Sequence, residues 1–340
     1  MTRRPDWFET LTGFRETSYR ETQAKLAVAD RRLYSRVNGR SWAIGEFEMV
    51  ALAELRRRAE RLPRRRGKPK LGVVQGDIRQ MHALPEYAGA MFQVASQFNA
   101  LEMVGPDVTP EDGVTRYALD HTQGPACALA AAPATIFRNY FATVGDGLGQ
   151  TRERQLDGLA GVGAALSAAL SRPTADLWTM KNGYALCSQP GLRAISTWLS
   201  NATAAEIDDL RGRLSIGLHR DVEVTTPGAP DGQRVAQAFC SALPVAYGNS
   251  AAENWRTFAT LALEAAYEAT LLATALQAAN GGSNVVLLTL LGGGAFGNGR
   301  EWIFAAIRRA LEWVRDFDLD VRIVSYAKPD PALIEFVETL

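Results

Sequence analysis

A glycine-rich loop close to the C-terminus has the residue types and the spacing best suited to binding chemistry. It lies between an apolar run, 285–291, and an amphipathic segment, 301–316, and it consists of Gly292, Gly293, Gly294, Ala295, Phe296, Gly297 and Asn298. Because glycine has no Cβ, backbone N–H groups in such a loop can converge on an anion. The positive end of the following helix adds to the attraction. We therefore expect a phosphate group here; the alternative is a turn needed only for tight strand-to-helix packing.

The same loop argues against two common nucleotide-binding classes. Its glycines fit neither the GxGxxG pattern of Rossmann dehydrogenases nor the P-loop pattern, in which Lys and then Ser or Thr follow the last glycine. The sequence therefore disfavours a Rossmann dehydrogenase and a P-loop NTPase.

Polar residues also follow two apolar runs earlier in the chain. The run 71–75 ends in Gly76-Asp77-Ile78, and the run 91–95 ends in Ser96-Gln97-Phe98-Asn99. In open α/β sheets, ligands bind beyond the C-terminal ends of the strands. Asp77, Ile78 and Asn99 are therefore candidate ligand-binding residues, although Asp77 could instead cap a helix or form a turn.

A third polar cluster directly precedes a helix that begins at Gly124-Pro125. Its residues, Asp120, His121, Thr122 and Gln123, could line a cavity and position a substrate or a water molecule. We favour Gln123 as a ligand-binding residue because it lies directly before the helix entry. A lone histidine such as His121 is more often a surface residue or a hydrogen-bonded structural one.

The elements that must position these residues follow an α/β pattern from residue 70 onward. After the two apolar strands come an Ala-rich helix, 126–142, which Pro133 should kink, and a long helix, 254–280. The last unit, 285–326, reads strand, glycine loop, helix and strand. Such a unit should cross over right-handed into a parallel sheet.

The length of 340 residues allows one large domain or two ordinary ones. Residues 1–69 are typical of an N-terminal α+β accessory region, with a hairpin around Asn38-Gly39 and a helix over 49–62. Residues 70–340 should form the main domain, in which 150–215 is a helical insertion.

Two of these motifs resemble those of a known family. Gly76-Asp77-Ile78 after the first strand and Leu291-Gly-Gly-Gly-Ala-Phe-Gly-Asn298 after the penultimate strand are similar to the macrodomain pattern. The resemblance is closest to the poly(ADP-ribose) glycohydrolase branch, whose late loop also reads Gly-x-Gly-Ala-Phe-Gly, and it covers roughly 70–145 and 220–340. It implies an α/β fold with a mixed sheet flanked by helices, to which the helical insertion and the N-terminal region are added.

The resemblance also implies a partner, which is ADP-ribose or an ADP-ribosylated substrate. By the family's pattern, Asp77 accepts a hydrogen bond from the adenine amino group, and the loop Gly292–Gly297 holds the diphosphate. Phe296 would pack near the distal ribose, the one farther from adenine, and Asn99 would contact that ribose.

The sequence departs from the family where a hydrolase needs its acids. The glycohydrolase branch has Gly-Gly-Gly followed by Gln-Glu-Glu after the second strand, whereas this chain has the acid-containing segment 102–113. Cleaving a ribosyl bond passes through an oxocarbenium-like state and usually needs a carboxyl group that protonates the leaving oxygen or activates water. Glu111 and Asp112 are the candidate catalytic acids, with Glu102 and Asp107 as neighbours.

Glu111 and Asp112 also have a structural interpretation. Thr109-Pro110-Glu111-Asp112 is typical of a helix start, with a capping residue, a proline and two acids in the first turn. Two functions therefore stay open: an ADP-ribosyl hydrolase, and a non-catalytic module that binds and senses ADP-ribose.

The basic residues suggest a third possibility. Residues 1–70 hold 18 Lys and Arg against 9 Asp and Glu, while 71–340 hold 19 against 28, so the net charge of zero conceals a polarised chain. The run Arg56–Lys70 could bind the phosphates of a nucleic acid. Pro63 and Gly67 interrupt it and no aromatic residue interleaves with it, which favours a solvated helix end and linker instead.

The composition bounds the remaining classes. With 47% apolar and 22% charged residues the chain can bury a core, and no apolar run is long enough to span a membrane. The first residues contain no apolar stretch after their positive charges, so we expect a cytoplasmic protein. The three Cys and three His are dispersed, and we expect no disulfide framework, metal site or cofactor.

Overall fold

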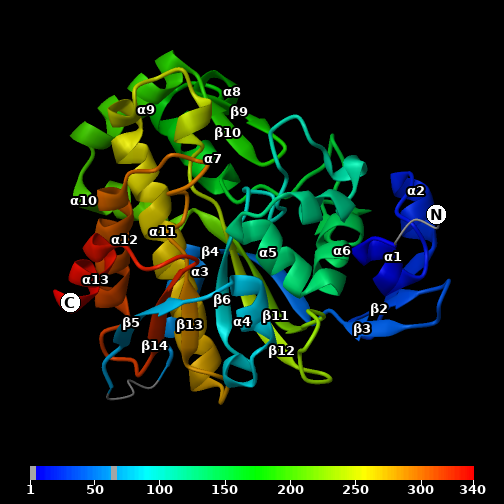
Figure 1. Ribbon diagram of the computed structural model, residues 1–340. Coiled ribbons are helices and arrows are strands. Elements are labelled where there is room, and N and C mark those ends of the chain that lie inside the picture. The colour runs from blue at the N-terminus through cyan, green and yellow to red at the C-terminus, as the bar shows by residue number, and fades with distance from the viewer. Residues whose placement is uncertain (1–4, 63–66) are drawn as a thin grey trace.

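A seven-stranded mixed sheet lies at the centre of the computed structural model, which describes residues 5–62 and 67–340 (Figure 1). The strand order is β4-β11-β12-β6-β13-β14-β5. Neighbours from β12 to β5 are parallel, whereas β11 is antiparallel to both β12 and β4. The strands are β4 (Glu46–Ala51), β11 (Ser215–Glu223), β12 (Arg234–Cys240), β6 (Met91–Ala95), β13 (Val285–Leu288), β14 (Asp320–Ser325) and β5 (Lys70–Gln75).

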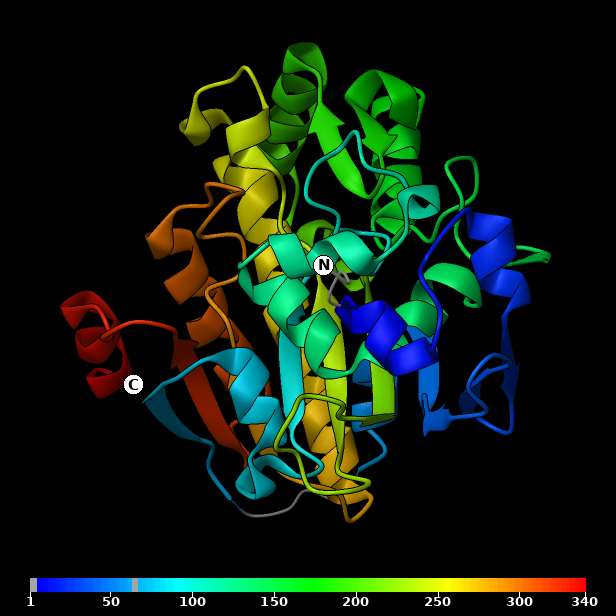
Figure 2. The same ribbon diagram turned by 45° about the vertical axis from the view of Figure 1, so that its right-hand side comes forward.

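Helices cover both faces of this sheet, with α4 to α6 on one side and α11 with α12 on the other (Figure 2). Successive residues of a strand point to opposite faces, so Met91 packs in the core under α11 while Phe92 packs in the core under α4 and α5. The mixed α/β architecture predicted from the sequence is confirmed. The helices are α4 (Ile78–Ala83), α5 (Gln123–Ala130), α6 (Ala132–Tyr140), α11 (Ala252–Ala279) and α12 (Arg300–Trp313).

The C-terminal unit forms as its sequence predicts. Strands β13 and β14 are parallel neighbours joined through the glycine loop and α12, and α13 (Pro331–Glu338) follows. The Ala-rich helix is divided into α5 and α6 at Ala131, two residues before Pro133. The predicted proline break is therefore confirmed.

The predicted helical insertion contains a hairpin as well as helices. Its elements are α7 (Ala160–Leu170), α8 (Thr174–Leu177), β9 (Trp178–Lys181), β10 (Tyr184–Cys187), α9 (Gln189–Asn201) and α10 (Ala204–Gly212). The turn of the hairpin presses against the segment after β6, because a Cβ on Gly183 would lie 2.6 Å from the Gln97 Cβ. A short ribbon, β7 (Thr143–Val144) with β8 (Gly147–Leu148), precedes the insertion.

The N-terminal region confirms one prediction and corrects another. The hairpin around Asn38-Gly39 is present as β2 (Arg32–Ser35) and β3 (Ser41–Ala43), beside β1 (Leu26–Ala29), α1 (Trp7–Thr12) and α2 (Tyr19–Ala24). The predicted helix over 49–62 is instead the end of β4 followed by α3 (Leu52–Ala59). β4, which lies within the region 1–69, is a strand of the main sheet and pairs with β11.

The basic run is only partly described, since Arg64, Arg65 and Arg66 lie outside the described residues. Within α3, Arg56 pairs with Asp208 and Glu268, and Arg58 pairs with Glu48 and Glu54. These arginines therefore hold the fold together. In the described part of the chain, no helix has the length and apolar character needed to cross a membrane.

Candidate functional site

A cleft opens at the C-terminal edge of the sheet, where β13 separates from β6. These strands pair only at Val286 with Met91 and at Leu287 with Phe92. Beyond that point the side chain of Gln123 pairs with β6 in place of β13. Its Oε1 accepts the Ala95 N–H at 2.8 Å, and its Nε2 donates to the Gln93 carbonyl at 2.8 Å. Gln123 thus completes the edge of β6 and brings the start of α5 to the mouth of the opening.

The cleft has two lobes, which meet at Asp120, Gln123 and Thr289. The Asp77 lobe has a volume of about 310 Å³, and its lining includes Asp77, Ile78, Arg79, His121 and Tyr326. The Phe296 lobe has a volume of about 220 Å³, and its lining includes Ser96, Gln97, Glu102, Tyr184, Tyr247, Gly292, Gly294, Ala295 and Phe296. Candidates from distant parts of the sequence therefore share one continuous cleft.

Asp77 is an exposed residue of the Asp77 lobe and also caps α4. Its Oδ1 accepts the Arg79 N–H at 2.8 Å. Asp77 thus caps α4 through Oδ1, which is the structural role that the sequence also allowed. Its carboxylate is exposed and borders the lobe as well.

Tyr326 faces the same lobe from the end of β14 and was not among the predicted site residues. Its side chain is 79% exposed, so its ring is available to a planar group bound beside Asp77. An aromatic residue directly after a parallel strand was the sequence signal that could have identified it.

Some residues of the glycine loop fix the shape of the loop, and others line the Phe296 lobe. Gly293, Gly297 and Asn298 shape it: their N–H groups donate to the carbonyls of Leu290, Gly294 and Gly292. Gly292 has a φ of +71°, and a Cβ there would lie 2.4 Å from the Ala242 Cβ. This turn therefore requires glycine for both conformation and space.

The remaining loop residues present unused donors to the cleft. Among the described residues, the N–H groups of Gly294, Ala295 and Phe296 donate to no protein acceptor, and all three residues line the Phe296 lobe. Gln123 and Gly124, whose N–H groups at the start of α5 have no acceptor among the described residues, line the same lobe. A Cβ on Gly124 would lie 1.9 Å from the Ala95 carbonyl oxygen, so only glycine allows α5 to begin this close to β6.

This donor set suits an anion held without cationic side chains. Within the described chain, no Lys or Arg lines the Phe296 lobe. A diphosphate there would instead meet consecutive backbone N–H groups and the positive end of a helix, which together form a common phosphate site in proteins.

Glu102 is the buried carboxyl group of the Phe296 lobe. It is 1% exposed, and its Oε1 and Oε2 accept hydrogen bonds from Arg138 Nη2 at 3.2 and 3.4 Å. Burial raises the pKa of Glu102 to about 7, although the neighbouring guanidinium of Arg138 acts in the opposite direction. A carboxyl group with such a pKa can give or take a proton near neutral pH.

Arg138 is fixed on several sides and so fixes Glu102. Its Nε donates to the Ala100 carbonyl at 3.0 Å, its Nη2 donates to Thr135 Oγ1 at 3.1 Å, and its guanidinium lies 3.7 Å from the Phe239 ring centroid. These contacts hold the Arg138 guanidinium in one position beside Glu102.

The predicted acids Glu111 and Asp112 lie outside the lining of the cleft. Asp112 Oδ2 accepts the Thr109 N–H at 2.8 Å and closes a capping box. Glu111 Oε2 accepts the Arg152 N–H at 2.8 Å. Both carboxylates thus support local structure, as the helix-start interpretation proposed, and Glu102 is the acid of this segment that reaches the cleft.

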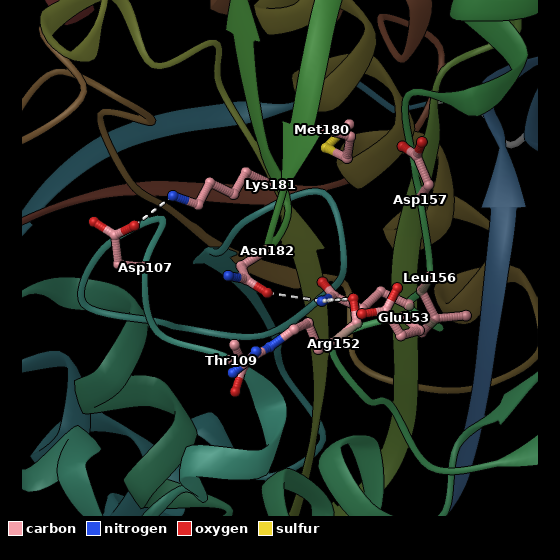
Figure 3. A pocket seen from close by; sticks show the side chains of 10 residues that line it. Asp107, Thr109, Arg152, Glu153, Leu156, Asp157, Met180, Lys181 and Asn182 are labelled. Carbon is pink, nitrogen blue, oxygen red and sulfur yellow. Dashed lines mark hydrogen bonds and ion pairs between the residues drawn. The ribbon is translucent and has the colours of Figure 1, made fainter. Parts of the chain in front are cut away.

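The acid-containing segment borders a separate hollow of about 560 Å³, which Figure 3 shows from close by. Asp107 and Thr109 lie on one wall, opposite Lys181 and Asn182 at the tip of the β9–β10 hairpin. Lys181 pairs with Asp107, and Asn182 Oδ1 accepts a hydrogen bond from Gln155 Nε2 at 2.8 Å. These contacts tie the walls of the hollow together.

Asn99 was predicted to contact a ribose, but its amide is engaged inside the protein. Its Nδ2 donates to Gln155 Oε1 at 2.9 Å, and its Oδ1 accepts the Leu101 N–H at 3.1 Å. The residue is fully buried and positions the segment between β6 and Glu102.

Three aromatic rings meet at the Phe296 lobe. The Tyr184 ring centroid lies 5.3 Å from those of Tyr247 and Phe296, which are 5.7 Å from each other. Tyr184 comes from the insertion and Tyr247 from the loop before α11, so no local sequence signal linked either residue to the glycine loop.

Two solved structures that are distantly similar to this chain are described here. Neither a family model nor a curated relative matches the chain. The poly(ADP-ribose) glycohydrolase of Deinococcus radiodurans in complex with ADP-ribose has 12% sequence identity and a TM-score of 0.44 over 84% of this chain and 89% of that one. The Thermomonospora curvata enzyme bound to the inhibitor ADP-HPD has 13% identity and a TM-score of 0.37 over 95% of this chain and 97% of that one.

Both of these solved structures are poly(ADP-ribose) glycohydrolases. Because both similarities are distant, the function of this chain has to be inferred from its own cleft.

Proposed function

We propose that the cleft binds ADP-ribose or an ADP-ribosyl group. Adenosine occupies the Asp77 lobe, the diphosphate lies along the glycine loop, and the distal ribose enters the Phe296 lobe. The observation behind this proposal is the row of unpaired N–H groups at Gly294, Ala295 and Phe296, placed beside the junction of two lobes. A ligand with a planar base, a doubly charged centre and a second sugar matches that order of features.

The Asp77 lobe suits adenine in two respects. The Asp77 carboxylate can accept a hydrogen bond from the exocyclic amino group, and the exposed ring of Tyr326 can stack on the base. Stacking of a base on an aromatic side chain contributes about 1–3 kcal/mol.

The Phe296 lobe suits hydrolysis of a ribosyl bond. Glu102, protonated in part near pH 7, donates its proton to the leaving group as the bond to the ribose carbon breaks and the electron pair goes to that group. Water then attacks the ribose carbon and returns a proton to Glu102. The function proposed is therefore an ADP-ribosyl hydrolase with Glu102 as the acid.

One observation favours a non-catalytic binder as the second candidate. Both oxygens of Glu102 accept hydrogen bonds from Arg138, as expected of a carboxylate whose task is structural. In that case the same cleft senses ADP-ribose without cleaving a bond.

Calorimetric titration with ADP-ribose, with AMP and NAD as comparison ligands, tests the binding site. Asp77→Ala should weaken binding by about 1–3 kcal/mol through the loss of charged hydrogen bonds. Gly294→Val tests the loop, because a Cβ at Gly294 meets nothing within 4 Å and its φ is not in the left-handed region. Valine can therefore be accommodated there while obstructing the phosphate.

Gly72→Val on β5 is the matched control, since a Cβ on Gly72 also meets nothing within 4 Å. We expect Gly294→Val to reduce the affinity for ADP-ribose at least tenfold and Gly72→Val to retain it. Equal affinity in both variants would show that the loop serves packing only.

A further inference from the structure

A buried histidine of the central sheet lies behind the pair of Glu102 and Arg138. His219 of β11 is fully buried and contacts two phenylalanine rings, whose centroids lie 5.2 Å (Phe47) and 5.7 Å (Phe137) from its own. It lines neither the Asp77 lobe nor the Phe296 lobe. Any influence of His219 on the cleft must therefore pass through a neighbouring side chain.

The two ring nitrogens of His219 have different partners. Nε2 lies 2.6 Å from the Ile44 carbonyl oxygen, and Nδ1 lies 3.5 Å from Arg138 Nη1. A carbonyl oxygen can only accept a hydrogen bond, so Nε2 carries the proton and Nδ1 presents its lone pair to the guanidinium. Burial and the positive charge of Arg138 hold the pKa of His219 well below its usual range, and the imidazole therefore stays neutral.

The N-terminal region supplies the carbonyl that fixes this arrangement. Gly45 has a φ of +61°, and a Cβ there would lie 1.8 Å from the Arg220 carbonyl oxygen. Only glycine lets the chain between β3 and β4 pass this close to β11 and place the Ile44 carbonyl beside His219. Because Nε2 is held by that carbonyl, the ring keeps its acceptor nitrogen directed at Arg138.

The Arg138 guanidinium divides its two terminal nitrogens between Glu102 and His219. Nη2 donates to both oxygens of Glu102, whereas the partner of Nη1 among the described residues is His219 Nδ1. A guanidinium stays charged in a protein, so when Glu102 takes up a proton the buried cation needs another acceptor. The lone pair of His219 serves as that acceptor and adds no second negative charge.

We propose that His219 is a positioning residue for Glu102, which acts by holding the Nη1 end of the Arg138 guanidinium. Its part in the reaction rests on the proposed function, in which Glu102 is the acid. Among the described residues, Glu102 is the acid that forms an ion pair with Arg138. Without the imidazole lone pair, the cation would depend more on the ionised form of Glu102, and that form would be favoured.

The other titratable or charged groups that act on Glu102 or His219 are Tyr117 of the turn Thr115–Leu119, Cys127 of α5 and Arg220 of β11. Burial raises the pKa of the Tyr117 phenol and of the Cys127 thiol well above their usual ranges. Arg220 is paired with two acids of β4. These three groups keep their charge between about pH 5 and 9, so a changed titration of Glu102 in that range reports on Arg138 and His219.

Two substitutions of His219 separate the roles of its two nitrogens. Asparagine places an amide oxygen near the position of Nδ1, so His219→Asn keeps an acceptor for Arg138. Glutamine places an amide nitrogen near the position of Nε2, so His219→Gln keeps a donor for the Ile44 carbonyl and offers Arg138 no acceptor. The pKa of Glu102 is measured from the infrared carbonyl band of its protonated form, which is assigned by its loss in Glu102→Gln.

We expect His219→Gln to lower the pKa of Glu102 by about one pH unit, as for the loss of one hydrogen bond to a charged group. His219→Asn should keep the wild-type value. In His219→Gln, kcat for an ADP-ribosylated peptide should fall about fivefold at pH 7 with KM unchanged, and the loss should disappear near pH 5. A general structural defect would lower kcat at every pH.

His82→Gln is the matched control for the loss of a buried histidine. His82 is also fully buried, but its ring nitrogens contact the Ile78 carbonyl and Gln237 and not Arg138. This variant should leave the infrared titration of Glu102 unchanged. The proposal is wrong if His219→Gln keeps the wild-type pKa of Glu102, or if His82→Gln lowers it to the same extent.

Nitrogen NMR of the unaltered protein, labelled at its three histidines, gives a test that depends on no variant of His219. His219 should be neutral and protonated at Nε2, and a proton on Nδ1 would overturn the proposal. If the protein binds ADP-ribose but cleaves no ADP-ribosylated peptide, the hydrolase function fails. The infrared titration still decides in that case whether His219 controls the proton on Glu102.

Discussion

At the scale of single residues, the Glu102 carboxyl is subject to two opposing effects. Burial disfavours its charge, and the Arg138 guanidinium 3.2 Å away favours it. Burial prevails, and the pKa rises to about 7. An acid that must protonate a leaving group near neutral pH needs such a balance.

Replacing Glu102 tests its role as the acid. Glu102→Gln keeps the size of the side chain and its hydrogen-bonding oxygen but cannot give up a proton. We expect release of ADP-ribose from an ADP-ribosylated peptide to fall by about 10²–10⁴-fold, with little change in the affinity for ADP-ribose. Asp112→Asn, outside the cleft, is the control, and unchanged turnover in Glu102→Gln would assign the chemistry elsewhere.

The pH dependence of turnover follows from the same residue. The protonated form of an acid is populated below its pKa, so the rate should be high below about pH 7 and should fall as pH rises through the Glu102 pKa of about 7. A profile of turnover from pH 5 to 9 measures this limb. A rate that increases over the same range would mean that the carboxylate acts as a base instead.

At the scale of elements, the start of α5 completes the sheet where β13 leaves it. Gln123 is the connection, since its amide pairs with both Gln93 and Ala95 of β6. The floor of the cleft therefore depends on one side chain that acts in place of a neighbouring strand.

Removing that amide should destabilise the fold. Gln123→Leu leaves the Ala95 N–H and the Gln93 carbonyl without partners, and each unpaired buried group costs about 1–3 kcal/mol. Denaturant unfolding measures the change. Gln80→Leu, at an exposed position of α4, should cost much less, and equal stabilities would mean that water replaces the lost bonds.

At the scale of the whole molecule, one ion-pair network joins four helices that are far apart in the sequence. Glu268 of α11 is fully buried and accepts hydrogen bonds from Arg56 of α3 and Arg309 of α12. Asp208 of α10 binds the same two arginines. The N-terminal region is thus bound to α10, α11 and α12 through α3, and to the main sheet through β4.

Breaking this network should have a large effect on stability. Glu268→Ala leaves two partly buried arginines short of a partner, and removing one member of a buried pair costs about 3–5 kcal/mol. Glu253→Ala on the same helix removes the exposed pair with Arg256 and should cost less than about 1 kcal/mol. A similar midpoint of unfolding for the two variants would contradict the structural role of Glu268.

The sequence by itself determined the elements whose signals are local. The strand, glycine loop, helix and strand of residues 285–326 form as predicted, as do the long helix α11, the break before Pro133 and the turn at Asn38-Gly39. Each depends on periodicity or turn chemistry within about 30 residues, so one stretch of chain is enough to define it. The cleft residues Asp77, Gln123 and Phe296 could be anticipated for the same reason, because they follow strand ends or precede helices.

Only the tertiary structure decided which of these segments meet. β4 pairs with β11, which lies more than 160 residues later. The apolar residues at the end of β4 continue the spacing of those in α3, so the sequence alone predicted one helix over both. Glu102 and Glu111 are acids of one segment, yet Glu102 lies buried at the cleft, where burial raises its pKa, while Glu111 lies outside the cleft lining and binds a backbone N–H. Tyr184 reaches the Phe296 lobe because its hairpin packs against the end of β6. Burial and contact between distant residues set these properties, and local spacing does not encode them.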